Sequence, residues 1–226
     1  MKRYVVLVCT IVLAMSIARP VLADSSHAVF AYTGDPTPLL SLNDGTVVLT
    51  ATGLGWYEGD GVPNGSSPGN NYIAGICGSS DACYGDNGNY HDWFTFNIPA
   101  GTVITDATLQ LYNPVNGYIS PNATETYTNW DVTTAVGDLG SVSGVGIFND
   151  LGSGIMYAST VVSAADDDIT VNIGLNGAAL SAINADAGSQ FAVGGAVNLT
   201  TTPEPSSVLL LGFGITGLIG YLRKRK

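Results

Sequence analysis

Residues 93–112 read Trp93-Phe94-Thr95-Phe96-Asn97-Ile98-Pro99-Ala100-Gly101-Thr102-Val103-Ile104-Thr105-Asp106-Ala107-Thr108-Leu109-Gln110-Leu111-Tyr112, and this stretch decides the fold class. Successive side chains of a strand point to opposite faces, so Phe94, Phe96 and Ile98 would share one face. After the Pro-Ala-Gly turn, apolar and polar residues alternate again over residues 107–111. We therefore predict a half-buried pair of strands here.

Short alternating segments recur between residues 24 and 202, separated by clusters of Gly, Ser, Thr, Asn and Asp. Such clusters are typical of turns. One helix is predicted at residues 176–187, where Leu180 and Ile183 share a face and Gly188 ends the helix. The further strands are predicted at residues 46–52, 155–162, 169–173 and 191–197. Many short strands with one short helix indicate an all-β protein, an antiparallel β-sandwich.

Residues 94–112 resemble the opening strands of jelly-roll modules found in secreted bacterial proteins. Asp131-Val132-Thr133 resembles the strand-to-turn step that follows in such modules. The resemblance implies a jelly-roll-like sandwich, and some of these modules bind carbohydrate. Because a fold does not carry its function with it, the resemblance supports the sandwich more than sugar binding.

The N-terminus has the three parts of a secretory signal. Met1-Lys2-Arg3 is basic, residues 5–17 are apolar, and Val21-Leu22-Ala23 places small or modest side chains at the cleavage positions. We predict a signal peptide over residues 1–23, cleaved after Ala23. An uncleaved N-terminal anchor is the alternative, because Arg19 and Pro20 are unusual next to a cleavage site.

The C-terminus combines an extended turn, an apolar run and a basic end. The three parts are Pro203-Glu204-Pro205, residues 206–222, and Arg223-Lys224-Arg225-Lys226. The prolines disfavour helix before them, so that segment stays extended and accessible. The run reaches the short end of the roughly 17 to 25 residues that a membrane-spanning helix needs, and we predict such a helix at residues 206–222. The basic residues would remain in the cytoplasm.

This tail resembles the PEP-CTERM sorting segment of exported bacterial proteins, also known as an ice-binding protein C-terminal domain. The resemblance implies export by the general secretion machinery, recognition by a membrane-embedded exosortase and removal of the helix. It also implies that the protein is anchored in the inner membrane only transiently and then reaches the cell surface or the extracellular matrix, in association with exopolysaccharide. We divide the chain into a signal peptide (1–23), a sandwich domain (24–200) and a sorting segment (201–226).

The charges are segregated along the chain. All seven Lys and Arg residues lie in the two terminal signals, as Lys2, Arg3, Arg19 and the last four residues, whereas all eighteen Asp and Glu residues lie between residues 24 and 204. Nucleic acid is excluded as a partner, because binding to phosphates depends on Lys and Arg. A high net charge of one sign also keeps secreted proteins soluble.

Two cysteines, Cys77 and Cys83, remain after export. An even pair in an oxidising compartment is best interpreted as a disulfide that closes a short loop. Only His91 stands close enough in the sequence to complete a zinc site, and the spacing departs from the Cys-x-x-Cys of redox enzymes.

Residues 58–92 are predicted to form one long loop, where function would concentrate. Asp60, Asp81 and Asp86 form a candidate calcium site, because calcium prefers carboxylate and carbonyl oxygens. The spacing matches no EF-hand, and a solvated loop without metal is the alternative. No other cofactor is expected.

The same region is rich in aromatic residues. Trp56, Tyr57, Tyr84 and Tyr90 are candidates for carbohydrate binding, because aromatic faces stack on the apolar faces of sugar rings. The alternative is that these side chains only pin the loop to the sandwich.

Enzyme signatures are absent from the sequence: it contains no Gly-x-Ser-x-Gly, no His-Glu-x-x-His, no P-loop and no dinucleotide fingerprint. We predict a non-catalytic surface or extracellular-matrix protein. A carbohydrate-binding module, with or without calcium, is the alternative. More remote alternatives are a glycoside hydrolase that uses Glu58 and Glu125, and an ice-binding protein, which the scattered Thr residues disfavour.

Overall fold

The computed structural model of the protein describes residues 28–33, 36–64, 71–78 and 88–198. They belong to one compact unit that covers Ser25–Thr200. The predicted signal peptide with Ala23 and the predicted sorting segment lie outside the described residues. Within the described ranges, none of the helices has the length and apolar character needed to cross a membrane.

The described residues form mostly β-strands. The strands are β1 (Ala28–Thr33), β2 (Leu39–Leu42), β3 (Val47–Thr50), β4 (Gly53–Glu58), β5 (Pro63–Asn64), β6 (Tyr72–Cys77), β7 (Gly88–Asn97), β8 (Ala107–Asn113), β9 (Thr124–Asp131), β10 (Met156–Ser163), β11 (Ile169–Gly174) and β12 (Gln190–Asn198). The α-helices are α2 (Val145–Leu151) and α3 (Gly177–Ala185), and the short 3-10 helices are η1 (Val136–Asp138) and η2 (Ala164–Asp166).

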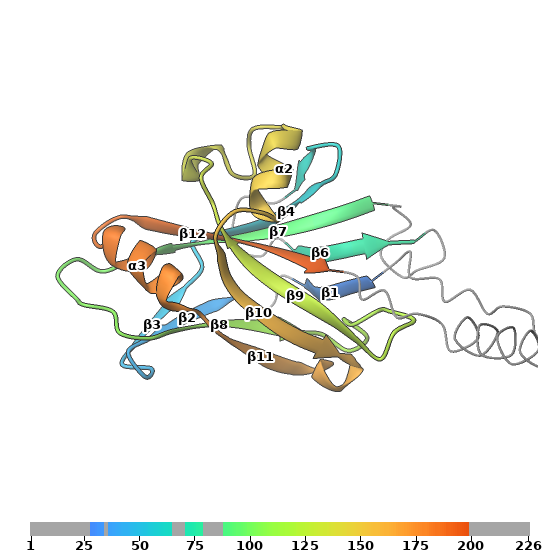
Figure 1. The fold of residues 1–226 in the computed structure, drawn as a ribbon, viewed down its shortest axis with the longest axis horizontal. Helices are drawn as coiled ribbons and strands as arrows, with labels where there is room; N and C mark the ends of the chain where they lie inside the picture. Colours follow the sequence, from blue (N-terminus) through green and yellow to red (C-terminus); the bar gives the residue numbers. More distant parts are fainter. Residues whose placement is uncertain (1–27, 34–35, 65–70, 79–87, 199–226) are drawn as a thin grey trace, which may run out of the picture. The chain divides into compact units, whose positions relative to one another are not determined.

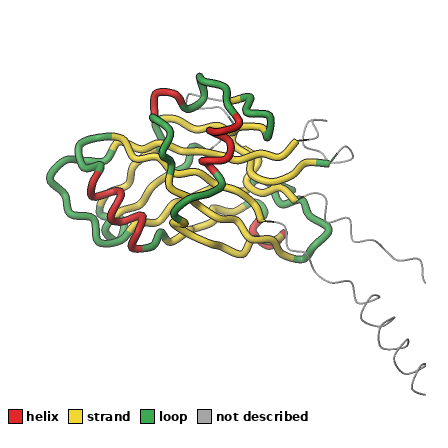
Figure 2. The backbone as a smooth tube through the Cα atoms, turned by 45° about the horizontal axis from the view of Figure 1, so that its top comes forward, coloured by secondary structure: helices red, strands yellow, loops and turns green. Residues whose placement is uncertain are grey.

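The strands form two antiparallel sheets that pack face to face (Figure 1). The larger, curled sheet has eight strands in the order β1-β6-β7-β12-β9-β10, with β4 added to β7 and β5 added to β4. The smaller sheet has four strands in the order β11-β8-β2-β3. Helix α2 lies over the outer face of the larger sheet, and α3 lies at the end of the sheets where β12 begins (Figure 2). The prediction of two packed antiparallel sheets is confirmed.

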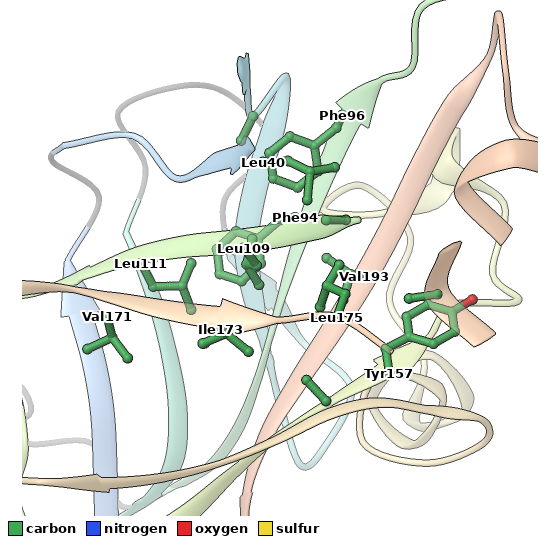
Figure 3. Close-up of a cluster of buried hydrophobic side chains, with 14 of the residues drawn as sticks. Leu40, Phe94, Phe96, Leu109, Leu111, Tyr157, Val171, Ile173, Leu175 and Val193 are labelled. Atoms are coloured by element: carbon green, nitrogen blue, oxygen red, sulfur yellow. The ribbon is translucent and has the colours of Figure 1, made fainter. Parts of the chain in front are cut away.

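The strands β7 and β8 do not pair with each other, contrary to the prediction from residues 93–112. Strand β7 pairs with β4, β6 and β12 in the larger sheet, whereas β8 pairs with β2 and β11 in the smaller one. Their apolar side chains meet across the core instead, with Phe94 and Phe96 facing Leu109 and Leu111 (Figure 3). Alternation fixes the face that a strand buries, but it does not name the hydrogen-bonded neighbour.

There are two short α-helices in the described part of the chain, and the sequence predicted only one. Helix α3 is the predicted one, and it begins at Asn176, whose side chain accepts hydrogen bonds from the backbone N–H groups of Ala178 and Ala179. Helix α2 is the addition. It begins at Gly144 without any side-chain cap and is held by packing of Phe148 and Leu151, so the usual capping signal is missing.

Residues 58–92 are not one long loop. They include β5, β6 and the first part of β7. Strand β6 is buried on both faces and therefore lacks the alternation that marks a half-buried strand. The glycines and serines around it carried the stronger signal, and this signal led to the wrong prediction of an irregular segment.

Candidate functional site

A groove of about 280 Å³ opens on the outer face of the larger sheet. Strands β4 and β7 form its floor, the segment around η1 forms one wall, and the start of β12 forms the end. The side chains and backbone that line it belong to Thr52, Gly53, Trp93, Thr95, Val136, Gly137, Leu139, Ser141 and Gln190. These residues come from four distant parts of the sequence, which only the tertiary structure brings together.

The floor of the groove carries two threonine hydroxyls. The hydroxyl of Thr52 donates to the carbonyl of Thr95 at 3.2 Å, and the two hydroxyls lie 3.1 Å apart. Thr95 is an outward residue of β7, two positions after Trp93 and on the same face as its indole. Both hydroxyls are therefore held in place by the protein itself, and their remaining capacity is to accept hydrogen bonds.

Tyr57 of β4 holds the wall of the groove. Its hydroxyl donates to the carbonyl of Val142 at 2.8 Å and accepts from the backbone N–H of Gly140 at 3.0 Å. The ring packs with Leu139 and the α2 side chains, and burial raises the pKa of the hydroxyl. Tyr57 thus fixes the segment that includes Ser141, whose hydroxyl donates back to Gly137 at 3.1 Å.

The chemistry of the groove is polar and uncharged. Among the described residues that line it, none has an ionisable side chain. Gln190 is exposed at the end of the groove, and its amide can both donate and accept hydrogen bonds. Such a lining suits a neutral ligand rich in hydroxyl groups, and it supplies no nucleophile–base pair for catalysis.

The aromatic residues predicted for carbohydrate binding do not form one exposed platform. Tyr57 and Tyr90 are 0% and 3% exposed, so neither offers a free ring face to a sugar. Trp56 is half-buried, meets Tyr90 edge-on with ring centroids 5.0 Å apart, and donates from its indole nitrogen to Asn71 at 3.3 Å. Tyr84 lies outside the described residues. The burial favours the pinning alternative for Tyr57 and Tyr90.

The predicted calcium ligands and the predicted disulfide remain predictions. Asp60 is exposed and accepts a hydrogen bond from the backbone of Val62 at 2.9 Å, while Asp81 and Asp86 lie outside the described residues. Within the described ranges, no three His, Cys, Asp or Glu side chains gather as metal ligands. Cys77 is buried at the end of β6, and its predicted partner Cys83 lies outside the described residues.

His91, which the sequence placed nearest to a zinc site, and Glu125, a candidate for glycoside hydrolysis, make structural contacts. His91 stacks on Phe148 of α2 with ring centroids 3.9 Å apart, and its Nδ1 lies 2.7 Å from the Phe148 carbonyl. Burial lowers the pKa of His91. Glu125 is buried and accepts hydrogen bonds from Ser120 and Asn122 at 2.7 and 2.8 Å.

Asp150 of α2 ties this helix to the chain that leaves β9. It accepts from the backbone N–H and the hydroxyl of both Thr133 and Thr134, at 2.6 to 3.0 Å. Partial burial alone would raise the pKa of Asp150, but these hydrogen bonds outweigh it and the pKa is lowered. The sequence reasoning missed Asp150, as it missed Thr52, Ser141 and Gln190, because no local motif marks them.

Comparison with known proteins assigns only the tail. Residues 201–226 match the family model described as the PEP-CTERM protein-sorting motif. No curated protein and no solved structure matches the chain. The predicted sorting motif is confirmed, and it marks an exported protein that an exosortase processes at the membrane.

Proposed function

We propose that this exported PEP-CTERM protein is a non-catalytic component of the cell surface or the extracellular matrix, associated with exopolysaccharide. The sorting motif at residues 201–226 carries the proposal, because it commits the chain to export and to an exosortase. The tail would anchor the protein only until it is processed. The folded body, a jelly-roll-like sandwich, would be the part that acts outside the cell.

The distribution of charge supports this proposal. Removal of both terminal signals would remove every Lys and Arg residue and leave a strongly acidic domain. Such a domain repels its own copies and acidic polymers, and so remains soluble outside the cell. Direct contact with polysaccharide would then be made through neutral surfaces.

A carbohydrate-binding module is the second candidate, and the groove between β4 and η1 is the observation that favours it. Hydroxyls of Thr52 and Thr95 and the amide of Gln190 surround a space of about 280 Å³, at the low end of the volumes of small-molecule sites. An uncharged lining suits a neutral sugar. The ligand in this proposal is therefore a neutral sugar unit of a polysaccharide.

The sorting part of the proposal is tested in the native host. Replacement of Pro203-Glu204-Pro205 by three alanines is expected to leave the protein membrane-bound and unprocessed, as detected by mass spectrometry of the cell and matrix fractions. Pro121→Ala, an exposed proline outside the motif, is the control and should be processed normally. Normal processing of the triple-alanine variant would contradict the proposal.

The carbohydrate candidate is tested on a glycan array with the full-length protein in neutral detergent. Gln190→Ala should weaken binding to a neutral glycan at least tenfold, whereas Gln110→Ala on the outer face of the smaller sheet should not change it. Loss of binding in Trp56→Ala but not in Gln190→Ala would place the site at Trp56 instead. Absence of binding to every glycan would remove this candidate and leave the sorting proposal intact.

A further inference from the structure

A carboxyl group lies buried in the middle of the larger sheet. Asp92 of β7 is 0% exposed and shares its inner face with Phe94 and Phe96. The sheet register places Asp92 opposite Gly195 of β12, and Gly195 opposite Asn129 of β9. Two polar side chains thus flank a glycine within one row of the sheet.

Gly195 leaves the space into which these polar groups converge. A Cβ atom at this position would lie 2.1 Å from Oδ1 of Asp92 and 2.1 Å from the hydroxyl oxygen of Tyr127. The Tyr127 hydroxyl donates to Oδ1 of Asp92 at 2.8 Å. Asn129 donates from its amide to the Tyr127 hydroxyl at 3.3 Å and to the Gly194 carbonyl at 3.2 Å.

Two acceptor atoms of this cluster lack a donor. Oδ2 of Asp92 and Oδ1 of Asn129 are buried, and neither has a hydrogen-bond partner in the described part of the chain. A buried acceptor without a donor is costly, and an ionised carboxylate costs far more. The cluster therefore needs at least one more hydrogen-bond donor.

The described part of the chain contains no Lys or Arg that could neutralise Asp92. The sequence has no Lys or Arg between residues 24 and 222. The titratable groups that interact with Asp92 are Tyr72 of β6 and Tyr127 of β9, and burial raises the pKa of both hydroxyls, so both stay neutral. Strand β4 places Trp56 beside Asp92, and β12 contributes only glycine there. His91, the preceding residue, points to the opposite face.

We propose that Asp92 keeps its proton in the folded domain. Folding then takes up a proton, and acidification stabilises the folded domain. A protonated Oδ2 is a donor, which the cluster lacks, and it removes the buried charge. Burial raises the pKa of Asp92 to about 7, although the hydrogen bond from Tyr127 opposes the shift. An exported protein meets the pH of its surroundings directly, so this carboxyl makes its stability respond to the external pH.

The direction of the effect follows from proton linkage. The pKa of Asp92 is raised in the folded state to about 7, above the value of about 3.9 for an unfolded Asp. Its contribution is therefore complete below about pH 4 and is lost as the pH rises toward 7. Within this window the folding equilibrium constant should fall by up to about tenfold for each pH unit.

The test is the pH dependence of unfolding of the full-length protein in neutral detergent. Asp92→Asn cannot ionise, so it should flatten the dependence between pH 4 and pH 8 and should melt above the wild type at pH 8. Asp44→Asn is the control, because it removes one exposed carboxylate and should keep the wild-type slope. Equal slopes for wild type and Asp92→Asn would overturn the proposal.

A second measurement needs no variant to fold. The ¹³C chemical shift of the Asp92 carboxyl in the wild type should titrate with a midpoint well above pH 5, and a midpoint near 4 would overturn the proposal. Calcium chloride added at pH 8 should not raise the melting temperature of the wild type more than that of Asp92→Asn. A calcium-dependent rise that Asp92→Asn abolishes would replace the proton by a bound cation, and would also overturn it.

Discussion

Strands β7 and β8 carry similar patterns in the sequence but have different surroundings in the fold. Strand β8 alternates strictly between buried and half-buried residues, with one face on the core and the other on the surface. In β7, the five consecutive residues from Asp92 to Phe96 are buried. The reason is that β7 packs on the smaller sheet on one side and on α2 and the η1 segment on the other.

The two strands also differ in what their outer faces form. The inner face of β7 holds the core and the proton-binding cluster at Asp92, while its outer face forms the floor of the groove through Trp93 and Thr95. The outer face of β8 carries Gln110, which donates to Asn172 of β11 at 2.9 Å. We expect substitutions to be costly on both faces of β7 and tolerated on the outer face of β8.

The largest effect is expected from Phe94→Ala on the inner face of β7. Phe94 is fully buried and its ring meets Tyr72 edge-on at 5.0 Å. Loss of the ring leaves a cavity, and the free energy of unfolding should fall by about 3 to 5 kcal/mol. Chemical denaturation of the full-length protein measures it. A cost below 1 kcal/mol would mean that the two sheets do not pack through this ring.

The next largest effect is expected from Gly194→Ala, which tests the packing of α2 on the outer face of the larger sheet. A Cβ atom at Gly194 would lie 2.5 Å from the carbonyl oxygen and 2.7 Å from the Cα of Leu151, so α2 would have to move. Overpacking of this kind should cost about 1 to 3 kcal/mol. Gly174→Ala is the control, because nothing lies within 4 Å of its Cβ position. Equal stability of the two variants would show that α2 does not rest on β12.

Asp150→Asn weakens the attachment of the same helix, α2, to the segment that follows β9. The negative charge and one of the two acceptor oxygens that serve Thr133 and Thr134 are lost, and the variant should be about 2 kcal/mol less stable at pH 7. Because the pKa of Asp150 is lowered in the folded state, its contribution is present above the unfolded pKa and is lost as the pH falls through the folded pKa. The gap between variant and wild type should therefore close below about pH 4. This sign is opposite to that of Asp92, and a gap that widens in acid would contradict it.

The smallest effect is expected from Gln110→Ala on the outer face of β8. The side chain lies on the surface and has one hydrogen bond to Asn172. Its removal should change the free energy of unfolding by no more than about 0.5 kcal/mol. Thermal unfolding in parallel with Phe94→Ala gives the comparison directly. A large loss would indicate that the outer face of the smaller sheet is covered by something that packs on it.

The sequence predicted several of the strands that alternate and the helix that is capped. Strands β8, β10, β11 and β12 and helix α3 lie where the periodicity and the Asn176 cap placed helix or strand. It predicted no strand at β1, β2, β4 or β9. It also failed for β6, which is buried on both faces, and for α2, which has no side-chain cap. Both elements are stabilised by tertiary packing, so neither carries a local sequence signal that would predict it.

The candidate site was less accessible to sequence reasoning than the fold. The aromatic residues near Trp56 were predicted to bind sugars because of their rings. In the structure, the hydroxyl of Tyr57 instead fixes the wall of the groove through hydrogen bonds. The groove residues Thr52 and Gln190 are ordinary polar residues far apart in the sequence. Residue type and spacing could not bring them together, because their proximity depends on strand order.

The sequence by itself determined the export and sorting signals, the segregation of charge and the faces that alternating strands bury, because these depend on composition and a period of two. The tertiary structure alone decided that β7 and β8 belong to opposite sheets, that Asp92 is enclosed next to Gly195, and that α2 covers the outer face of β7. The physical reason is that the face of a strand is a local property, whereas its neighbours and the cover over it depend on contacts between distant segments.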